Sequence, residues 1–388
     1  MFTIQTMNKI SPAGLSRFPA GEFRYGEEVE NPDAFLLRSA SLHDAVLPAS
    51  LKAIARSGAG VNNIPVDQCS KAGIVVFNTP GANANAVKEL VIGALIMTSR
   101  HVADAVDWAR TLKGSGADVP KLVEKGKSRF VGPEIAGKRL GVIGLGAIGV
   151  MVANAAGALG MDVYGYDPYL SVDAAWHISR AIHRAASLQE IYEKCDYITI
   201  HVPLNPETRG MFNASAFAAM RQGVRVFNFA RGELAVPADV VEGLQSGKLA
   251  SYTVDFPCDE LLGVPGVLAV PHLGASTPES EDNCASMAAG ELIDFLKMGS
   301  IRHSVNFPTA ELPRSSETRI TVIHRNIPNM ISQISACIAQ DNINIENLLN
   351  KSRGNYAYTI IDVSGEAVDH SVQSLRAVPD VIRVRVIK

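Results

Sequence analysis

The chain has 388 residues, too many for one ordinary core, and this length predicts two or three domains. Hydrophobic residues make up 47% and charged residues 19%, the formal net charge is −3, and no lysine- or arginine-rich block occurs. These values argue against nucleic acid or an anionic membrane as a partner and favour a small-molecule ligand.

The cysteines predict a reducing compartment. There are five, an odd number, and they are widely scattered without a CxxC motif or a Cys/His cluster. We therefore expect free thiols and no metal site. The opening segment MFTIQTMNKISPAG lacks the apolar core of a signal peptide, and no apolar run approaches the roughly 20 residues that span a bilayer. A cytoplasmic protein is expected.

The first third of the chain predicts a parallel sheet covered by helices. From Ala34 onward, apolar runs that end in glycine or proline turns alternate with helical patterns. The strand candidates are DAFLLRSA, LKAIARSGAG and GIVVFNTP, and the long helix-like segment ANAVKELVIGALIMTSR follows them. The segment before Asp33 is short and matches no usual strand and helix, so its architecture stays open.

A second series predicts a doubly wound dinucleotide-binding unit. It contains six strand candidates with helical connections between most of them: RLGVIGLG, DVYGYDP, CDYITIHVPL, VRVFNFARG, YTVDF and VLAVPHLG. A long helix is then expected between Pro278 and a terminating Gly299. Such a helix would return the chain to the first domain.

The last third predicts a linker and a separate small domain. Residues 301–317 are rich in proline, serine and arginine, as linkers are. The remainder has the order strand, helix, strand, strand, helix, strand, which is the ferredoxin-like arrangement. The predicted domains are therefore a split substrate domain (1–97 and 272–300), a Rossmann domain (98–271), a linker (301–317) and a C-terminal domain (318–388).

The segment GLGAIG predicts a nucleotide site. Gly144, Gly146 and Gly149 follow a strand and open a helix, where glycines permit a tight turn, approach of the backbone to a pyrophosphate, and helix packing on the sheet. Asp167 lies about 20 residues further on, at the end of the next strand, where its carboxylate would accept hydrogen bonds from ribose hydroxyls. It would repel a 2′-phosphate, so NAD is favoured over NADP.

Three side chains at strand ends of the same unit are candidates for the chemistry. Arg231, Glu260 and His272 would converge because ligands bind at the carboxyl ends of parallel strands. An arginine fork suits an α-keto acid, a histidine exchanges a proton near neutral pH, and a glutamate beside it favours the protonated ring. Taken singly, each has a structural alternative: a cap or phosphate contact for Arg231, one of several loop acids for Glu260, and a core histidine for His272.

The chain resembles the D-isomer-specific 2-hydroxyacid dehydrogenases over nearly its whole length. Eight segments carry the resemblance: RSASLHD, ARSGAGVNNI, FNTPGANANAV, GVIGLGAIG, GYDP, HVPLNPETRG, NFARGE and PHLGAST. The tail HRNIPNMISQISACIAQDNINIE is similar to an ACT regulatory domain. Two departures are Asn329, where the ACT pattern usually has glycine, and DFPCDEL, where the family usually has DVFxxEP. The implied fold is therefore two doubly wound α/β domains plus a ferredoxin-like ACT domain.

The resemblance implies roles for individual residues. Arg231 would bind the substrate, His272 would be the acid/base with Glu260 as its partner, and Asp255 would hold the nicotinamide carboxamide. Arg56, Ser57 and Gly58 would form the substrate loop, and Lys127 and Arg129 are further cations for a substrate phosphate, although any cation here could be plain surface. The remaining NAD contacts would come from Ala147, Ile148, Val202, Pro203, Thr208, Ala230, His272 and Gly274.

The implied reaction is NAD-dependent oxidation of 3-phosphoglycerate in serine biosynthesis. The ACT tail implies inhibition by L-serine through His324, Asn326 and Asn344 at a subunit interface, with a purely dimerising ACT domain as the alternative. A homodimer or homotetramer is expected. Two other functions stay open: a dehydrogenase of glycerate, hydroxypyruvate or 2-hydroxyglutarate, and a nucleotide-sensing binding protein without catalysis.

Overall fold

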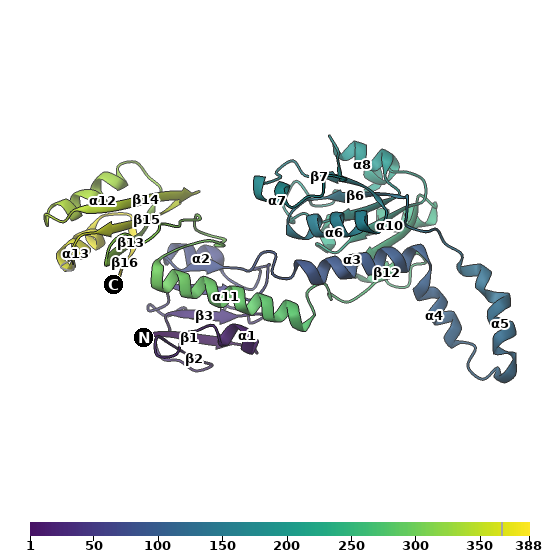
Figure 1. Cartoon of the computed structure of the whole chain (residues 1–388), viewed down its shortest axis with the longest axis horizontal. Helices are drawn as coiled ribbons and strands as arrows, with labels where there is room; N and C mark the ends of the chain where they lie inside the picture. The colour runs from purple at the N-terminus through teal and green to yellow at the C-terminus, as the bar shows by residue number, and fades with distance from the viewer. Residues whose placement is uncertain (366–367) are drawn as a thin grey trace. The chain divides into compact units, whose positions relative to one another are not determined.

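The computed structural model describes residues 1–365 and 368–388. The chain forms two compact units, which are described separately (Figure 1). The first unit combines Met1–Asn83 with Pro278–Lys388, and the second is Ala84–Thr277. Among the described residues, no helix combines the length and the apolar character that a bilayer crossing requires.

The second unit is built on a parallel sheet of seven strands in the order β12-β11-β10-β9-β6-β7-β8. From β6 the chain adds β7 and β8 on one side of the sheet, and it then returns to the other side of β6 with β9. A topological switch point therefore lies between β6 and β9. Ligands bind at such points in open α/β sheets. The strands are β6 (Arg139–Ile143), β7 (Asp162–Tyr166), β8 (His183–Arg184), β9 (Tyr197–Ile200), β10 (Val224–Asn228), β11 (Leu249–Val254) and β12 (Val267–Ala269).

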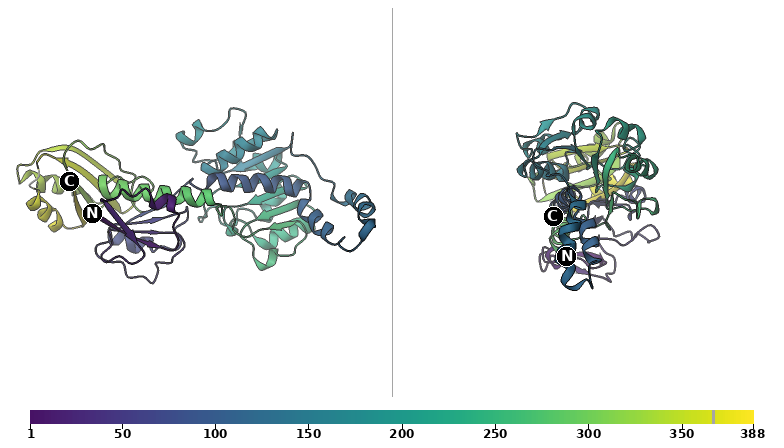
Figure 2. Two further views of the ribbon diagram at one scale, coloured as in Figure 1. Left: turned by 60° about the horizontal axis from the view of Figure 1, so that its bottom comes forward. Right: turned by 90° about the vertical axis from the view of Figure 1, so that its right-hand side faces the viewer.

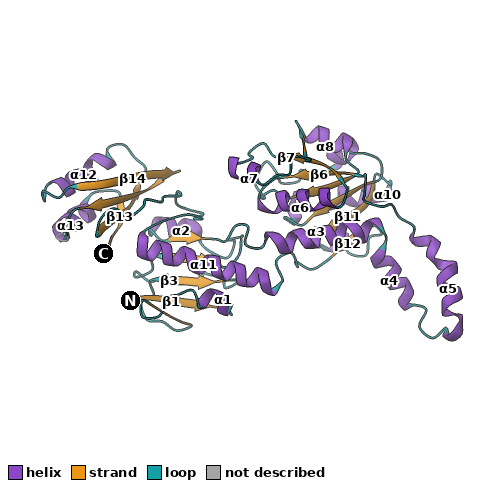
Figure 3. Ribbon diagram, in the orientation of Figure 1, coloured by secondary structure: helices purple, strands orange, loops and turns teal. Residues whose placement is uncertain are grey.

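Helices cover both faces of this sheet (Figure 3). One core joins the sheet to α3 and α6, and a second core on the opposite face joins it to α8, α9 and α10. The helices of the unit are α3 (Ala84–Ser99), α4 (Val102–Arg110), α5 (Val119–Gly126), α6 (Ala147–Ala158), α7 (Val172–Trp176), α8 (Leu188–Lys194), α9 (Ala214–Ala219) and α10 (Pro237–Gln245). Single 3₁₀ turns are η1 (Gly116–Asp118), η2 (Lys127–Phe130), η3 (Gly232–Leu234) and η4 (Asp259–Leu261).

The first unit begins with a five-stranded parallel sheet in the order β2-β1-β3-β4-β5. Helix α11 lies over these strands, as both views in Figures 1 and 2 show, and its apolar side packs on Leu36, Ala55 and Phe77. Helix α2 and loops cover the other face. The elements are β1 (Phe2–Met7), α1 (Pro12–Leu15), β2 (Phe23–Gly26), β3 (Ala34–Leu37), β4 (Ala53–Arg56), α2 (Val66–Lys71), β5 (Val75–Phe77) and α11 (Pro278–Met298).

The amino-terminal segment forms regular structure that the sequence did not reveal. Strand β1 lies inside the sheet between β2 and β3, and Ile4 is fully buried. The strand is only six residues long and includes the polar Thr3, Gln5 and Thr6, so its apolar pattern is weak. Hydrogen bonding to β2 on one side and to β3 on the other compensates for that weak apolar pattern.

The C-terminal domain has the predicted order of strands and helices. Its antiparallel sheet is arranged β14-β15-β13-β16, and α12 and α13 pack on one face around Ile334, Ile361 and Leu375. Asn329 begins α12 with φ +69°, a left-handed conformation that asparagine tolerates. The elements are β13 (Thr318–Arg325), α12 (Met330–Ala339), β14 (Ile345–Arg353), β15 (Tyr356–Val363), α13 (Asp369–Ala377) and β16 (Val381–Ile387).

The compact units differ from the predicted domain limits at three places. Helix α3 belongs to the second unit from Ala84 because it packs on α6, whereas the predicted limit was residue 98. The return to the first unit occurs at Pro278 instead of residue 272. The predicted linker is partly buried: the Asn306 amide donates to the Ile74 carbonyl (2.9 Å), and Phe307 is fully buried. The Asn306 contact attaches the segment to the first domain, and the Phe307 ring also packs edge-on against Tyr356 of the C-terminal domain.

Candidate active site

The three glycines of GLGAIG have three different steric surroundings. Gly144 has φ +88°, and a Cβ there would lie 2.6 Å from the His201 carbonyl oxygen. A Cβ on Gly149 would lie 1.9 Å from the Gly144 carbonyl oxygen, so helix α6 can start only with glycine at this position. Gly146 caps α6 and has no heavy atom within 4 Å of an added Cβ. The backbone is therefore open to a ligand at Gly146, where the helix amides favour a pyrophosphate.

Asp167 lies directly beyond β7 and faces this glycine loop. Its carboxylate accepts hydrogen bonds from the backbone amides of Leu145 (2.8 Å) and Tyr169 (2.8 Å). The side chain is half-buried and lines a cavity of about 380 Å³ together with Leu145 and Tyr166. The carboxylate is thus held beside the glycine loop, the position that a ribose contact requires.

The segment after β9 lies against the same loop. The Val202 side chain would be 2.9 Å from a Cβ on Gly144. The Thr208 hydroxyl donates to the Pro203 carbonyl (2.7 Å) and closes the turn that follows. Burial lowers the pKa of His201 to about 4, so its ring is neutral, and it shares a hydrogen bond with the Thr199 hydroxyl (3.0 Å). Loops after β6 and β9 therefore meet at the switch point.

Arg231 lies beyond β10 in a loop that Asn228 fixes. The buried Asn228 amide donates to the Arg231 carbonyl (2.8 Å), and its oxygen accepts from the Ala230 amide (3.2 Å). The Arg231 guanidinium is exposed, donates to the Ala230 carbonyl (2.6 Å), and lies 5.9 Å from the centre of the Phe256 ring. Its planar fork is available for a carboxylate.

The ring of Phe256 brings Arg231 and His272 together. The exposed His272 ring lies 4.4 Å from the Phe256 ring, centroid to centroid, at an interplanar angle of 47°. Both predicted groups are thus within 6 Å of one aromatic ring. Sequence reasoning missed Phe256, although it is the residue after Asp255 in a segment already singled out, DFPCDEL.

Asp255 is a buried carboxylate with unused acceptors. It is 1% exposed, and neither oxygen has a hydrogen-bond partner of normal geometry within residues 1–365 and 368–388. Burial raises its pKa to about 6, and the charge of Arg231 and the amide of Gly274 oppose that rise. A buried acceptor without a partner is costly. An amide NH₂ group, such as a nicotinamide carboxamide carries, would satisfy it.

Glu260 lies in η4 on the segment that carries Asp255 and Phe256. Its own backbone amide and the Cys258 thiol lower the pKa of its carboxyl group, so it is charged at neutral pH. The side chain is exposed. The role of Glu260 beside His272 stays a prediction.

Lys127 and Arg129, the predicted phosphate cations, lie in η2 beyond α4 and α5. Lys127 pairs with Glu124 one helical turn away. The Arg129 guanidinium lies over the rings of Trp108 (5.3 Å) and Phe130 (5.4 Å). Figure 1 shows α4 and α5 projecting from the body of the second unit. No contact among the described residues brings either cation to Arg231.

The predicted substrate loop follows β4 in the first unit. Arg56 donates from Nε to the Arg38 carbonyl (3.1 Å), and Ser57 is buried. Gly58 has φ +150°, and a Cβ there would lie 2.4 Å from an Arg56 guanidinium nitrogen. Glycine at this position therefore lets the arginine fold back over its own loop.

The three predicted effector residues do not meet within one chain. His324 is buried, and its ring shares hydrogen bonds with the Arg325 carbonyl (2.7 Å) and the Thr359 hydroxyl (3.0 Å). Asn326 lies just beyond the same end of β13. Asn344 precedes β14 at the opposite end of the sheet, because β14 and β13 both begin opposite Val363. A site that uses all three residues needs two copies of the chain.

A doubly wound parallel sheet with this glycine loop and carboxylate defines a dinucleotide-binding domain. Residues 92–274 match the family model of the D-isomer specific 2-hydroxyacid dehydrogenase, NAD binding domain. The chain is 31% identical over 340 residues to a D-3-phosphoglycerate dehydrogenase of Haemophilus influenzae, covering 84% of this chain and 79% of that protein. The chain belongs to the D-isomer-specific 2-hydroxyacid dehydrogenase family, and its second unit contains the NAD-binding domain.

Other relatives are similar over a smaller share of their length. The D-3-phosphoglycerate dehydrogenase of Bacillus subtilis is 31% identical over 358 residues, which are 88% of this chain and 65% of the relative. That of Rattus norvegicus is 35% identical over 288 residues, 72% of this chain and 51% of the relative. This chain thus spans less than two thirds of both proteins.

Solved structures share the fold. The NAD⁺-bound 3-phosphoglycerate dehydrogenase of Entamoeba histolytica has a TM-score of 0.60 at 24% identity and covers 79% of this chain and 98% of its own. A D-2-hydroxyisocaproate dehydrogenase has a TM-score of 0.64 at 22% identity and covers 79% and 100%. The two-domain fold is therefore common to enzymes with different substrates.

Proposed function

We propose that the chain is an NAD-dependent dehydrogenase that oxidises D-3-phosphoglycerate to 3-phosphooxypyruvate, the first committed step of L-serine biosynthesis. The observation that carries the reaction type is the grouping of Arg231 and His272 around Phe256, with the unsatisfied Asp255 carboxylate beside it. The names of the relatives support the substrate.

Each side chain of the site has its own role in the proposed reaction. NAD, when bound, supplies the acceptor for the hydride that leaves carbon 2. The Arg231 guanidinium binds the substrate carboxylate and orients that carbon. His272 accepts the proton of the 2-hydroxyl group and returns it in the reverse direction. Glu260 stabilises the protonated imidazole. The Asp255 carboxylate would accept hydrogen bonds from the carboxamide of bound NAD and so help to orient the nicotinamide.

Recognition of the substrate phosphate is the second half of the proposal. Arg56 at the end of β4 is the first candidate because it lies in the predicted substrate loop with Ser57 and Gly58. Lys127 and Arg129 are weaker candidates because each already has a partner on its own helical segment. The competing substrates, unphosphorylated 2-hydroxy acids, would not require such cations.

The C-terminal domain supports a proposal of feedback inhibition by L-serine. The matching positions are His324, Asn326 and Asn344, and their separation within one chain favours a site between two copies. A homodimer or homotetramer is therefore part of this proposal.

The test is NADH oxidation by the purified protein with 3-phosphooxypyruvate, hydroxypyruvate and 2-oxoglutarate at equal concentrations. A preference of about 100-fold for the phosphorylated acid, or about 2.7 kcal/mol of transition-state binding, would support the assignment. His272→Ala should abolish turnover, whereas His370→Gln, which changes an exposed histidine of the C-terminal domain, should not. Equal or faster reaction of the unphosphorylated acids would contradict the substrate, and absence of turnover with every acid would favour a nucleotide-sensing protein.

A further inference from the structure

A basic cavity lies in the first unit, where the C-terminal domain meets the five-stranded sheet and the end of α11. Its volume is about 440 Å³, within the usual range of about 300 to 1,000 Å³ for small-molecule sites. Side chains from β1, α11, α13 and β16 contribute to its walls. One acidic side chain, that of Glu22, faces six basic ones: Lys52, Lys297, Arg314, Arg376, Arg385 and Lys388.

Two of the six cations are neutralised by neighbouring acids. Lys297 pairs with Glu22 (2.5 Å), and Lys52 pairs with Asp33 behind the cavity wall. The other four have no carboxylate partner within the described residues 1–365 and 368–388. The cavity therefore keeps an excess of positive charge even when the carboxylate of the terminal Lys388 is counted, and such a concentration of charge attracts anions.

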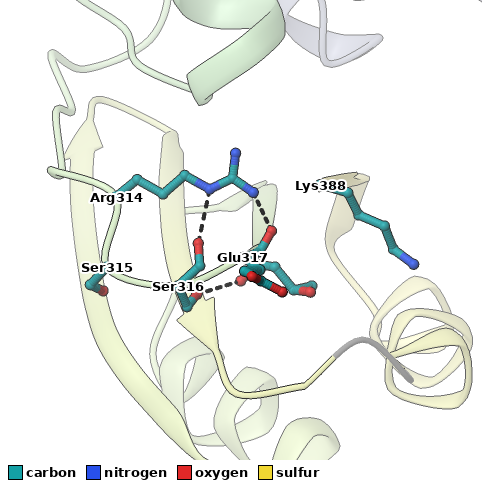
Figure 4. A pocket seen from close by; sticks show the side chains of 6 residues that line it. Arg314, Ser315, Ser316, Glu317 and Lys388 are labelled. Atoms are coloured by element: carbon teal, nitrogen blue, oxygen red, sulfur yellow. Dashed lines mark hydrogen bonds between the residues drawn. The ribbon is translucent and has the colours of Figure 1, made fainter.

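Backbone contacts hold Arg314 and Arg385, two of these four cations, in place. Arg314 donates from Nε to the Ser316 carbonyl (2.9 Å) and from Nη2 to the Glu317 carbonyl. Figure 4 shows these bonds in an adjoining cavity of about 660 Å³, which Lys388 lines on the other side. Arg314 and Lys388 line both cavities, and the acidic Glu317 also lines the adjoining one. A guanidinium that is already fixed loses little entropy when it binds a ligand.

Arg385 ties the cavity to helix α11. Its guanidinium lies over the Phe295 ring (4.4 Å) and donates to the carbonyls of Phe295 (3.3 Å) and Leu296 (3.0 Å) in the last turn. The partial negative charge of a helix C-terminus offsets a cation only in part. Burial lowers the pKa of Arg385, and the nearby Arg383 adds to this effect. A half-buried cation that makes no ion pair leaves a favourable place for an anion.

We propose that this cavity binds a small anion with at least two negative charges, carried on phosphoryl or carboxylate groups, between the C-terminal domain and the first domain. Guanidinium forks recognise both groups in the same way. Because β16 and α13 lie on one side and β1 and α11 on the other, a bound anion connects the two domains. The proposal does not depend on the substrate of the enzyme.

The test is isothermal titration calorimetry of the full chain with sodium phosphate and with citrate, with sodium chloride balancing the ionic strength. Arg376 and Lys388 are the variants of choice because both are exposed and neither has an ion-pair partner among the described residues. We expect saturable binding of at least one anion, weakened about fivefold in Arg376→Gln and further in the double variant with Lys388→Gln. Tighter binding of phosphate would indicate a phosphoryl ligand, and tighter binding of citrate a polycarboxylate.

Two controls separate this cavity from other anion sites. Arg24→Gln changes an exposed arginine of β2 outside the cavity and should leave the affinity unchanged. Arg231→Gln removes the arginine of the candidate active site and should also leave it unchanged. The proposal is overturned if neither anion binds saturably up to about 10 mM, if the Arg376→Gln protein binds as tightly as the wild type, or if Arg231→Gln abolishes binding.

Discussion

The phenyl ring of Phe256 lies 4.4 Å from the imidazole of His272 and 5.9 Å from the guanidinium carbon of Arg231. An aromatic face attracts a cation, and an exposed contact of this kind contributes about 0.5 to 1 kcal/mol. Phe256 therefore contributes to the positions of these two exposed side chains.

Replacement of Phe256 should impair turnover without unfolding the protein. We expect Phe256→Ala to lower kcat/KM about tenfold and Phe256→Leu to lower it less, because leucine retains apolar contact but no aromatic face. Steady-state kinetics with the best keto acid measures both variants. Phe18→Leu removes a ring from the first domain and should leave the kinetics unchanged. Unchanged kcat/KM in Phe256→Ala would show that the ring does not position the two side chains.

Asp255 should make the protein less stable as the pH rises. Burial raises its pKa from an ordinary value of 3.8 to about 6 in the folded state, so the folded state binds the proton more tightly. The free energy of unfolding then falls as the pH rises from about 4 to about 6 and stays low above that range. We expect Asp255→Asn to raise the stability by about 2 kcal/mol at pH 7 and by much less at pH 4.

Chemical denaturation at the two pH values measures this effect. Asp44→Asn, at an exposed loop position, should show no such difference. The same Asp255→Asn protein should bind NAD more weakly, because one carboxylate acceptor becomes a donor. A protein that loses stability at pH 7 on this substitution would contradict the view that the carboxylate is buried without a partner.

The sequence predicted features that depend on neighbours along the chain. Gly144 and Asp167 could be assigned because strand, turn and spacing are local, and the alternating strands and helices follow from hydrophobic period. Phe256 was missed because an aromatic residue beyond a strand is typical of a core, and its contact with His272 spans 16 positions of the chain that include η4 and β12. The basic cavity was missed because Lys52, Arg314 and Arg385 are brought together only by the packing of two domains.

The glycine loop offers two substitutions with opposite consequences. Alanine at Gly149 would place a Cβ 1.9 Å from the Gly144 carbonyl oxygen, and only a backbone shift relieves that contact. We expect Gly149→Ala to destabilise the second unit by about 3 kcal/mol or more. Gly146→Ala meets no atom of the protein within 4 Å, and its φ of −73° suits alanine. Its stability should change by less than about 1 kcal/mol.

Gly146→Ala, the substitution that should hardly change stability, should weaken cofactor binding. The methyl group of Gly146→Ala points into the space where a pyrophosphate approaches the backbone, so the dissociation constant for NADH should rise at least about tenfold. Fluorescence titration measures NADH binding, and thermal denaturation measures stability. Wild-type affinity for NADH in Gly146→Ala would mean that the cofactor phosphates do not pass over this residue.

The ion pair of Arg319 and Asp362 should control the acid stability of the C-terminal domain. Both side chains are fully buried, and the carboxylate accepts two hydrogen bonds from the guanidinium, at 2.6 and 2.8 Å. Burial alone would raise the pKa of Asp362, but Arg319 and Ser315 outweigh it and lower that pKa below its usual value. A lowered folded-state pKa contributes stability above the unfolded value, and that stability is lost as the pH falls.

Removal of one partner should therefore be more harmful than removal of both. Asp362→Ala leaves a buried guanidinium, and we expect a loss of about 3 to 5 kcal/mol at pH 7. Arg319 also donates to the Met298 carbonyl at the end of α11 (2.9 Å), so the same change should loosen the junction with the first domain. The double variant Arg319→Met with Asp362→Leu should recover part of the loss, because an apolar pair leaves no buried charge. Urea unfolding of the three proteins at pH 7 and pH 4 measures these differences, and a single variant as stable as the wild type at pH 7 would contradict the assigned role of the pair.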